Sequence, residues 1–450
     1  MDLKNKRVLV VGLGKSGVAS ALFLQAHGAR VTVSDTKAPD QLKEEIPILL
    51  DHGITVETGG HGERTFREQD LIVVSPGVPY DAPPLVAARA QGEPVIGEIE
   101  LAAQHLAGPI VAITGSNGKT TTTALTGEIL AGSGFKTLVG GNIGTPAILL
   151  VEQATPETYT VLEVSSFQLE TIQTFRPKVA VILNITPDHL DRHRTMEAYV
   201  NAKVRIFENQ HGNDFAVLNE DDPTCSTLGD RVKAPLFWFS RKREVGQGAY
   251  VRDGRIFFRD AHGQHEIMLA SEIALKGAHN VENVLAAVCA SALLGCRPEQ
   301  IRQAVVNFKA VEHRIEYVAT VNGVEYYNDS KATNVDATIK ALESFPRNIH
   351  LILGGKDKGS PYTVMNDLLR ERVKRVYTIG AAAPKIEAEI KGTTEVVHAE
   401  TLENAIKRAY AVAQPGDIVL LAPACASFDQ FKSYEHRGRV FKDTVRALSR

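Results

Sequence analysis

The sequence has few cysteines, no excess of either charge and no long hydrophobic run. Its cysteines, Cys225, Cys289, Cys296 and Cys425, form no C-x-x-C pair, which argues against zinc or dithiol chemistry and favours small core residues. Lys plus Arg number 50 and Asp plus Glu 53, so the net charge of −3 offers no basic field for nucleic acid or anionic lipid. No apolar run approaches the ~20 residues of a membrane span. We therefore expect a reduced, cytoplasmic protein without nucleic-acid or membrane partners.

The length and the order of the patterns predict three α/β domains. At about 150 residues per domain, 450 residues suggest three. Short β-branched runs alternate with helical patterns in residues 1–98, which predicts a small doubly wound parallel sheet. The alternation resumes in residues 99–311, with a more β-like, charged stretch at 214–273 that suggests an antiparallel edge. A third alternating segment at 312–450 suggests a second Rossmann-like sheet.

A glycine turn between a strand and a helix is the most informative local pattern. The apolar run 110–113 leads into Thr114-Gly115-Ser116-Asn117-Gly118-Lys119-Thr120-Thr121. The glycines let backbone N–H groups turn toward a phosphate, the lysine supplies a cation, and Thr120 or Thr121 can place a hydroxyl on Mg²⁺. Only two residues separate the glycines, fewer than in the common P-loop. The pattern therefore predicts a shortened nucleotide-phosphate loop in a P-loop-type ATPase domain.

A second glycine motif, Gly12-Leu13-Gly14-Lys15-Ser16-Gly17, follows the first strand, and Asp35 ends the next one. On its own this pattern is typical of dinucleotide binding, with the aspartate on a ribose hydroxyl. Hydride transfer has no use for ATP, however, and the second phosphate loop makes that function awkward. The motif requires only a diphosphate or similar anion at a helix N-terminus, which a UDP-sugar also supplies.

Acidic and imidazole groups follow two buried strands of the central segment. Glu163 stands near the end of the strand at 160–164, where a carboxylate is costly unless it is paired or binds a metal. The next strand leads into the loop 184–193, which carries His189 and His193. Because carboxyl ends of parallel strands share one sheet edge, Glu163 and His189 are candidates for one Mg²⁺ site. The spacing of the two histidines lacks the glutamate of a zinc-hydrolase helix.

With these motifs in hand, the chain resembles the Mur ligases, ATP-dependent amide-forming enzymes of peptidoglycan assembly. The resemblance extends over almost the whole length and is most specific to members that add D-glutamate to UDP-N-acetylmuramoyl-L-alanine. Beyond the stretches above, it rests on the segments 141–144, 279–283, 313–314, 328–334, 353–355 and 423–431.

The resemblance implies an N-terminal domain for UDP, a central ATPase and a C-terminal domain for the amino acid, acting as a monomer. It also implies two Mg²⁺ ions and a carbamylated Lys203, although spacing alone makes that residue an ordinary helix-surface lysine. Either Lys356 or Lys358 could bind glutamate, and we favour Lys358. The implied contacts are Lys15, Ser16, Asp35, Thr36, Lys37, Asn142 and His189 for the UDP substrate; Gly115, Ser116, Asn117, Gly118, Lys119, Thr120, Thr121, Asn283, Arg314 and Asp329 for ATP; Thr120, Glu163, His189 and Lys203 for metal; Thr333, Lys358, Ser427 and Tyr434 for D-glutamate.

The reaction that the resemblance implies would use Lys119, His189 and Lys203 as catalytic residues. ATP would convert the alanyl carboxylate to an acyl phosphate, which the amine of D-glutamate would attack, with the C-terminal domain closing over the site. Alternatives within the class are a ligase for another amino acid and a folate-polyglutamylating enzyme. A dinucleotide-dependent oxidoreductase and a nucleotide-binding regulator are the alternatives from other classes.

Overall fold

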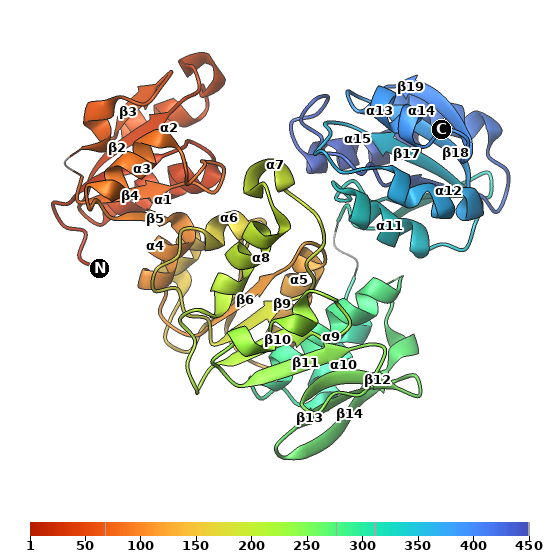
Figure 1. Ribbon diagram of the computed structural model, residues 1–450, viewed down its shortest axis with the longest axis horizontal. Coiled ribbons are helices and arrows are strands. Elements are labelled where there is room, and N and C mark those ends of the chain that lie inside the picture. The colour runs from red at the N-terminus through yellow and green to blue at the C-terminus, as the bar shows by residue number, and fades with distance from the viewer. Residues whose placement is uncertain (68, 276, 310–311, 449–450) are drawn as a thin grey trace.

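The computed structural model describes residues 1–67, 69–275, 277–309 and 312–448 and has three α/β lobes, each built on its own sheet (Figure 1). The three-domain α/β fold predicted from the sequence is confirmed. The boundary predicted near Glu98 is the first residue of a helix, while the boundary at 311 falls on residues 310–311, outside the described residues. None of the helices in the described ranges is long and apolar enough to cross a bilayer.

The N-terminal lobe is a five-stranded parallel sheet in the order β3-β2-β1-β4-β5. The apolar runs at 8–11 and 71–74 are buried on both faces, as expected for the centre of a parallel sheet. Its elements are β1 (Arg7–Val11), α1 (Lys15–Ala26), β2 (Arg30–Asp35), α2 (Glu45–Asp51), β3 (Thr55–Thr58), β4 (Leu71–Val74), α3 (Pro83–Ala90), β5 (Val95–Gly97) and α4 (Glu98–His105).

The central lobe has a nine-stranded sheet in the order β14-β13-β12-β11-β10-β9-β6-β8-β7. It is parallel from β7 to β12, and only β12, β13 and β14 pair in antiparallel fashion, so the antiparallel edge is narrower than the stretch 214–273. Its strands are β6 (Ile110–Thr114), β7 (Thr137–Gly141), β8 (Tyr159–Glu163), β9 (Val179–Ile182), β10 (Phe215–Asn219), β11 (Leu236–Ser240), β12 (Gly248–Arg252), β13 (Arg255–Asp260) and β14 (Gly263–Leu269). Its helices are α5 (Lys119–Gly132), α6 (Ser166–Leu169), α7 (Leu190–His193), α8 (Met196–Val204), α9 (Ala278–Ala292) and α10 (Pro298–Asn307), with the 3-10 helix η3 (Ala147–Gln153).

The C-terminal lobe has a six-stranded sheet in the order β15-β16-β20-β17-β18-β19, antiparallel only between its first two strands. Its strands are β15 (Glu316–Val321), β16 (Val324–Asn328), β17 (Ile349–Gly354), β18 (Val373–Ile379), β19 (Glu395–Glu400) and β20 (Ile418–Leu421). Its helices are α11 (Val335–Glu343), α12 (Asn366–Arg372), α13 (Ala383–Glu389), α14 (Leu402–Val412) and α15 (Tyr434–Ala447).

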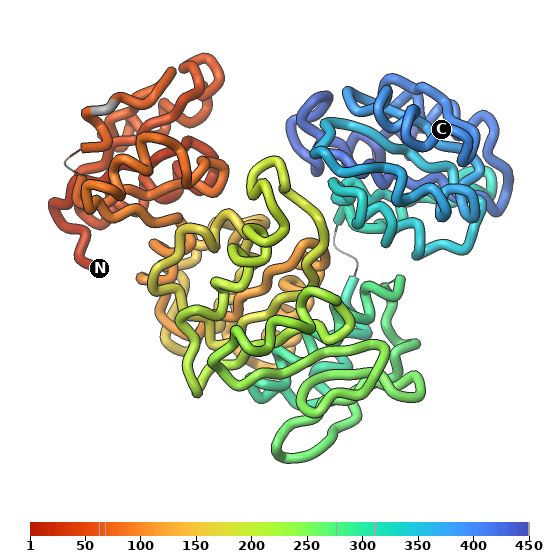
Figure 2. The backbone as a smooth tube through the Cα atoms, viewed as in Figure 1, coloured from red at the N-terminus to blue at the C-terminus, as the bar shows by residue number. Residues whose placement is uncertain are grey.

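The two lobe junctions differ in chemistry. One hydrophobic cluster runs from the N-terminal sheet through α4 into the central sheet, with Ile99 and Leu101 of α4 packed in the same core as Ile148 of η3. The C-terminal lobe has separate hydrophobic cores on the two sides of its sheet. In the backbone trace the N-terminal and C-terminal lobes lie on different sides of the central lobe (Figure 2). The N-terminal junction is therefore apolar, and the C-terminal lobe meets the rest through polar contacts described below.

A buried carboxylate fixes the start of the central lobe. Glu100 of α4 is fully buried and its carboxylate oxygens accept hydrogen bonds at 2.5–2.9 Å. The donors are the backbone N–H groups of Gln173, Thr174 and Phe175 and the side chains of Gln104 and Thr174. Burial alone would raise the pKa of Glu100, but these hydrogen bonds outweigh it and hold the pKa below its usual value.

We expect Glu100→Gln to lower the free energy of unfolding by about 2 kcal/mol, because an amide cannot accept from all these donors and its NH₂ faces N–H groups. Since the folded pKa is depressed, the contribution of Glu100 is present above the unfolded pKa of about 4.3 and is lost as pH falls through the folded pKa. Thermal unfolding at pH 7 and at lower pH measures this contribution of Glu100 to stability. Glu152→Gln, at an exposed position of η3, is the control; equal melting of the two variants at pH 7 would contradict the prediction.

Candidate functional site

The glycine loop joins β6 to α5 and presents the first turn of that helix. Gly118 is left-handed (φ +87°), and a Cβ there would lie 2.2 Å from Oδ1 of Asn283, so only glycine fits. The backbone N–H groups of Ser116 and Asn117 donate to the backbone and side-chain oxygens of Asn184. The N–H groups available to an anion are therefore those that open α5, where a helix leaves its donors without intrahelical partners.

The side chains of the loop differ in their hydrogen bonding. The Ser116 hydroxyl is buried and donates to the carbonyl of Thr186, so this side chain holds the loop in place. The Lys119 ammonium donates to the carbonyls of Gly115 (2.9 Å) and Ser116 (2.8 Å). The Thr121 hydroxyl is buried and has no hydrogen-bond partner within the described ranges.

Glu163 connects the phosphate loop to the neighbouring strand end. Its carboxylate is buried at the end of β8, where Oε2 accepts the Thr120 hydroxyl at 2.7 Å. Oε1 accepts the Asn142 side-chain amide at 2.9 Å, just after β7. The chain Thr120–Glu163–Asn142 therefore spans three adjacent segments at the carboxyl edge of the sheet, the edge at which open α/β sheets bind ligands.

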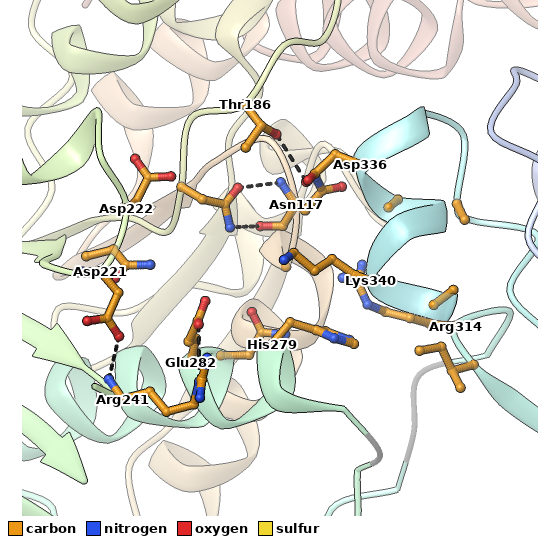
Figure 3. A pocket seen from close by; sticks show the side chains of 18 of the residues that line it. Asn117, Thr186, Asp221, Asp222, Arg241, His279, Glu282, Arg314, Asp336 and Lys340 are labelled. Atoms are coloured by element: carbon orange, nitrogen blue, oxygen red, sulfur yellow. Dashed lines mark hydrogen bonds and ion pairs between the residues drawn. The ribbon is translucent and has the colours of Figure 1, made fainter. Parts of the chain in front are cut away.

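A polar pocket of about 250 Å³ lies between the central and C-terminal lobes (Figure 3). It brings together Asn117, Gly118 and Asn283 from the central lobe with Arg314 and Asp329 from the C-terminal lobe. All five were predicted from the sequence as ATP contacts. In Figure 3, Asp336 meets Asn117 and Thr186 at one end of the pocket, and Asp221 and Arg241 lie at the other.

Arg314 carries the best-placed group for an anion in this pocket. Its Nε is buried and has no hydrogen-bond partner in the part of the chain that the structure describes. Burial lowers the pKa of its guanidinium, against the opposing charges of Asp329 and Glu163. Burial raises the pKa of Asp329 to about 6, although Arg314 opposes the shift. A buried guanidinium nitrogen with an unmade hydrogen bond fits a phosphate oxygen.

Several cations share the site and repel one another. Burial lowers the pKa of Lys119, and Arg314 and Lys358 lower it further against the attraction of Glu163 and Asp188. Burial also lowers the pKa of Lys331, with Arg314 and Lys119 adding to the effect. Such a surplus of positive charge is relieved by a polyanionic ligand.

Lys203 lies inside the protein rather than on a helix surface. Its side chain is 1% exposed, and its ammonium donates to the carbonyl of Gly115 at 2.9 Å. It also lies 4.6 Å over the ring of Tyr199. Burial, reinforced by the charge of Lys119, lowers the pKa of Lys203 well below its usual value. The site therefore favours an uncharged amine at this position.

His189 is the N-cap residue that precedes the short helix α7, and its backbone is left-handed (φ 54°). Its ring contacts Phe167 edge-on at 4.9 Å, and its Nε2 lies 3.6 Å from Oδ2 of Asp188. Burial lowers the pKa of His189 to about 4, against the attraction of Asp188. The imidazole is therefore neutral at pH 7 and keeps a lone pair for a metal ion. Within the described residues no cluster of three or more His, Cys, Asp or Glu could hold a metal.

A second pocket, of about 760 Å³, lies between the N-terminal and central lobes. It is lined by the first glycine motif, by the segment 75–84 and by Asn142, and Asn142 links it to Glu163. The carboxylate of Asp35 accepts from the N–H groups of Leu13 (2.7 Å) and Lys37 (2.8 Å), so it also fixes the shape of the glycine turn. The sequence-predicted residues on this lining are Lys15, Ser16, Asp35, Thr36, Lys37 and Asn142; His189 is not part of it.

The residues predicted for D-glutamate lie on three segments of the C-terminal lobe. Lys358 points to the central lobe, with its ammonium 3.5 Å from Oδ1 of Asp188, whereas Lys356 is exposed and pairs through its backbone with Ala426. Tyr434 begins α15, and its hydroxyl accepts from Lys331 at 3.3 Å. Ser427 is buried after β20, and Thr333 precedes α11. Among the described residues no hydrogen bond joins these four predicted side chains to one another.

Contacts between the central and C-terminal lobes were missed by the sequence reasoning. Asn334, the N-cap of α11, donates to Oδ2 of Asp188 at 3.0 Å, and Asp336 accepts from Asn117 and Thr186. An N-cap asparagine followed by an acid in the first turn is a recognisable helix start. Nothing in the linear sequence, however, identifies Asp188 as its partner 146 residues away.

Comparison with known proteins supplies the family. The chain matches the sequence models of the Mur ligase MurD-like N-terminal domain (residues 6–97), the Mur ligase middle domain (113–291) and the Mur ligase glutamate ligase domain (313–425). It is 69% identical over 449 residues to the UDP-N-acetylmuramoylalanine–D-glutamate ligase of Koribacter versatilis, covering 100% of this chain and 99% of the relative. It is 59% identical to the ligase of the same name from Acidobacterium capsulatum, covering 99% and 97%.

Solved structures share the fold at lower identity. The UDP-N-acetylmuramate-alanine ligase MurC of Thermotoga maritima superposes with a TM-score of 0.62 at 20% identity, covering 98% of this chain and 100% of that one. MurF ligase of the same organism, solved in complex with ADP, gives 0.62 at 17%, covering 99% and 96%. The predicted resemblance is confirmed over the full length: this chain belongs to the Mur ligase family.

Proposed function

We propose that this protein joins D-glutamate to UDP-N-acetylmuramoyl-L-alanine at the expense of ATP, a step of peptidoglycan precursor synthesis. The observation that carries the proposal is the set of hydrogen bonds Thr120–Glu163–Asn142, which runs from the first turn of α5, just after Gly118 of the first pocket, to Asn142 on the lining of the second. A UDP-linked substrate in the N-terminal pocket would reach Asn142 with its alanyl end, and a nucleotide at α5 would reach Thr120 with its phosphates. The carboxylate to be activated and the phosphate that activates it therefore meet at Glu163.

The first step transfers the γ-phosphoryl group of ATP to an oxygen of the alanyl carboxylate, which gives an acyl phosphate and ADP. Lys119 and the N–H groups of the first turn of α5 would hold the transferring group by position and charge. Arg314, with its free buried Nε, would bind a phosphate oxygen from the C-terminal side.

The second step is attack by the amine of D-glutamate on the acyl carbon. The carbon–oxygen bond to phosphate breaks, inorganic phosphate leaves, and the amine loses a proton. Thr333, Lys358, Ser427 and Tyr434 would place the amino acid, with Lys358 binding a carboxylate. The half-buried Lys358, already directed at the central lobe, supports this choice over the exposed Lys356.

The hydrogen-bonded Thr120 hydroxyl and Glu163 carboxylate are oxygen donors that suit Mg²⁺. The family resemblance would add the neutral His189 imidazole and a carbamate oxygen on Lys203 as further ligands. Carbamylation requires an uncharged amine, which the burial of Lys203 favours. When bound, Mg²⁺ would neutralise negative charge on the phosphates. Two ions, a cytoplasmic location, a monomeric state and domains at 1–98, 99–311 and 312–450 stay predictions.

The reaction predicts that phosphate release from ATP and Mg²⁺ requires both UDP-N-acetylmuramoyl-L-alanine and D-glutamate. Lys119→Ala should lower the rate about 10²- to 10³-fold, because it removes a cation from the transferring phosphoryl group. Lys136→Ala, at an exposed position of the same lobe, is the matched control. Release supported equally by L-alanine, diaminopimelate or L-glutamate would contradict the amino-acid assignment, and release without any amino acid would favour a nucleotide-binding regulator.

Carbamylation of Lys203 has a readout apart from activity. In ¹³C-labelled bicarbonate the parent protein should show a carbamate carbon resonance that disappears in Lys203→Met, because burial shifts Lys203 toward the neutral amine that adds CO₂. The variant should also lose activity about 10- to 100-fold, as expected when a metal site loses an oriented ligand. The same resonance in both proteins, or none in either, would show that Lys203 is not modified.

A further inference from the structure

Asp336 joins the C-terminal lobe to the phosphate loop. It lies in the first turn of α11, and its Oδ2 accepts the side-chain amide of Asn117 at 2.5 Å and the hydroxyl of Thr186 at 3.1 Å (Figure 3). These partners lie 219 and 150 residues away in the chain. Hydrogen bonds to an ionised acceptor are among the stronger ones in proteins.

The two partners of Asp336 belong to one rigid unit of the central lobe. Asn184 accepts the Asn117 backbone N–H through Oδ1 (2.8 Å) and returns a bond from its own amide to the Asn117 carbonyl (3.0 Å). The Ser116 hydroxyl donates to the Thr186 carbonyl (2.9 Å) and accepts the Thr186 N–H (3.0 Å). These hydrogen bonds hold the phosphate loop against the segment after β9. Asp336 accepts one further hydrogen bond from each of the two segments.

The rest of α11 and its N-cap connect the contact made by Asp336 with the nucleotide pocket. Asn334 reaches Asp188 at 3.0 Å, one residue before His189. Ala337, Lys340 and Ala341, on the same helix, line the nucleotide pocket together with Asp336. The same helix thus contributes both a wall of the pocket and the carboxylate docked on the phosphate loop.

We propose that Asp336 is a positioning residue that couples docking of the C-terminal lobe to the shape of the phosphate loop and thereby keeps phosphate release tied to amide formation. The proposal rests on the ligase reaction proposed above. With the lobe docked, the acyl phosphate is shielded and meets only the amine. With it undocked, water attacks the acyl carbon, the bond to phosphate breaks, and carboxylate, inorganic phosphate and one proton are released.

The test is to measure phosphate and amide product together in the full-length protein. Asp336→Ala should raise KM for ATP about tenfold, with a smaller change in kcat, because a charge-assisted contact that shapes the site is lost. It should also release more phosphate per amide formed. Asp336→Asn, which keeps an acceptor oxygen, should recover most of both properties. Glu403→Ala, an exposed acidic residue in the first turn of α14 as Asp336 is in α11, is the matched control and should behave like the parent protein.

A double-variant comparison separates this role from a general loss of stability. Thr186→Val removes one donor to Asp336 and keeps the side-chain shape, so combining it with Asp336→Ala should add little to the effect of Asp336→Ala on KM. Fully additive effects, or an Asp336→Ala protein with the parent's KM for ATP and the parent's phosphate-to-amide ratio, would overturn the proposal. If the parent protein forms no amide, the proposed function fails instead.

Discussion

The hydrogen-bonded chain from Thr120 through Glu163 to Asn142 is the contact on which the arrangement of the site depends. A buried carboxylate needs partners, and here each of its oxygens takes a donor from a different ligand-binding segment. This requirement places the opening of α5 beside the segment after β7. It therefore fixes the distance between a pocket that suits a nucleotide and one that suits a UDP-linked substrate.

The two lobe junctions are held by different kinds of contact. The N-terminal lobe shares an apolar core with the central lobe through α4 and η3, so the pocket between them is built into the fold. The C-terminal lobe meets the central lobe through Asn334, Asp336 and Lys358, all polar. Polar contacts exchange with water at modest net cost, whereas an apolar core does not separate easily. The junction held by hydrogen bonds is therefore the easier of the two to separate.

Patterns along the sequence predicted the local features of the fold, and the family resemblance added expected roles for individual residues. Both glycine motifs, the strand that carries Glu163 and the alternation of strands and helices follow from short-range steric and hydrophobic rules, and they located the loop at α5 and the three-lobe α/β fold. The burial of Lys203 could not be derived, since its spacing is that of a surface lysine and its environment is made by the phosphate loop of another segment. The same limit applies to Asp188 and Asp336, whose partners are distant in sequence.

The central claim is that the nucleotide phosphate and the alanyl carboxylate meet at Glu163 and exchange a phosphoryl group. The most direct test uses UDP-N-acetylmuramoyl-L-alanine with ¹⁸O in the alanyl carboxylate and follows the inorganic phosphate by ³¹P NMR. Transfer of one ¹⁸O to each phosphate released with the amide is the predicted result, because the carboxylate oxygen leaves with the phosphoryl group. Phosphate free of ¹⁸O would show that ATP is cleaved without activating the carboxylate, and the account of the site would be wrong.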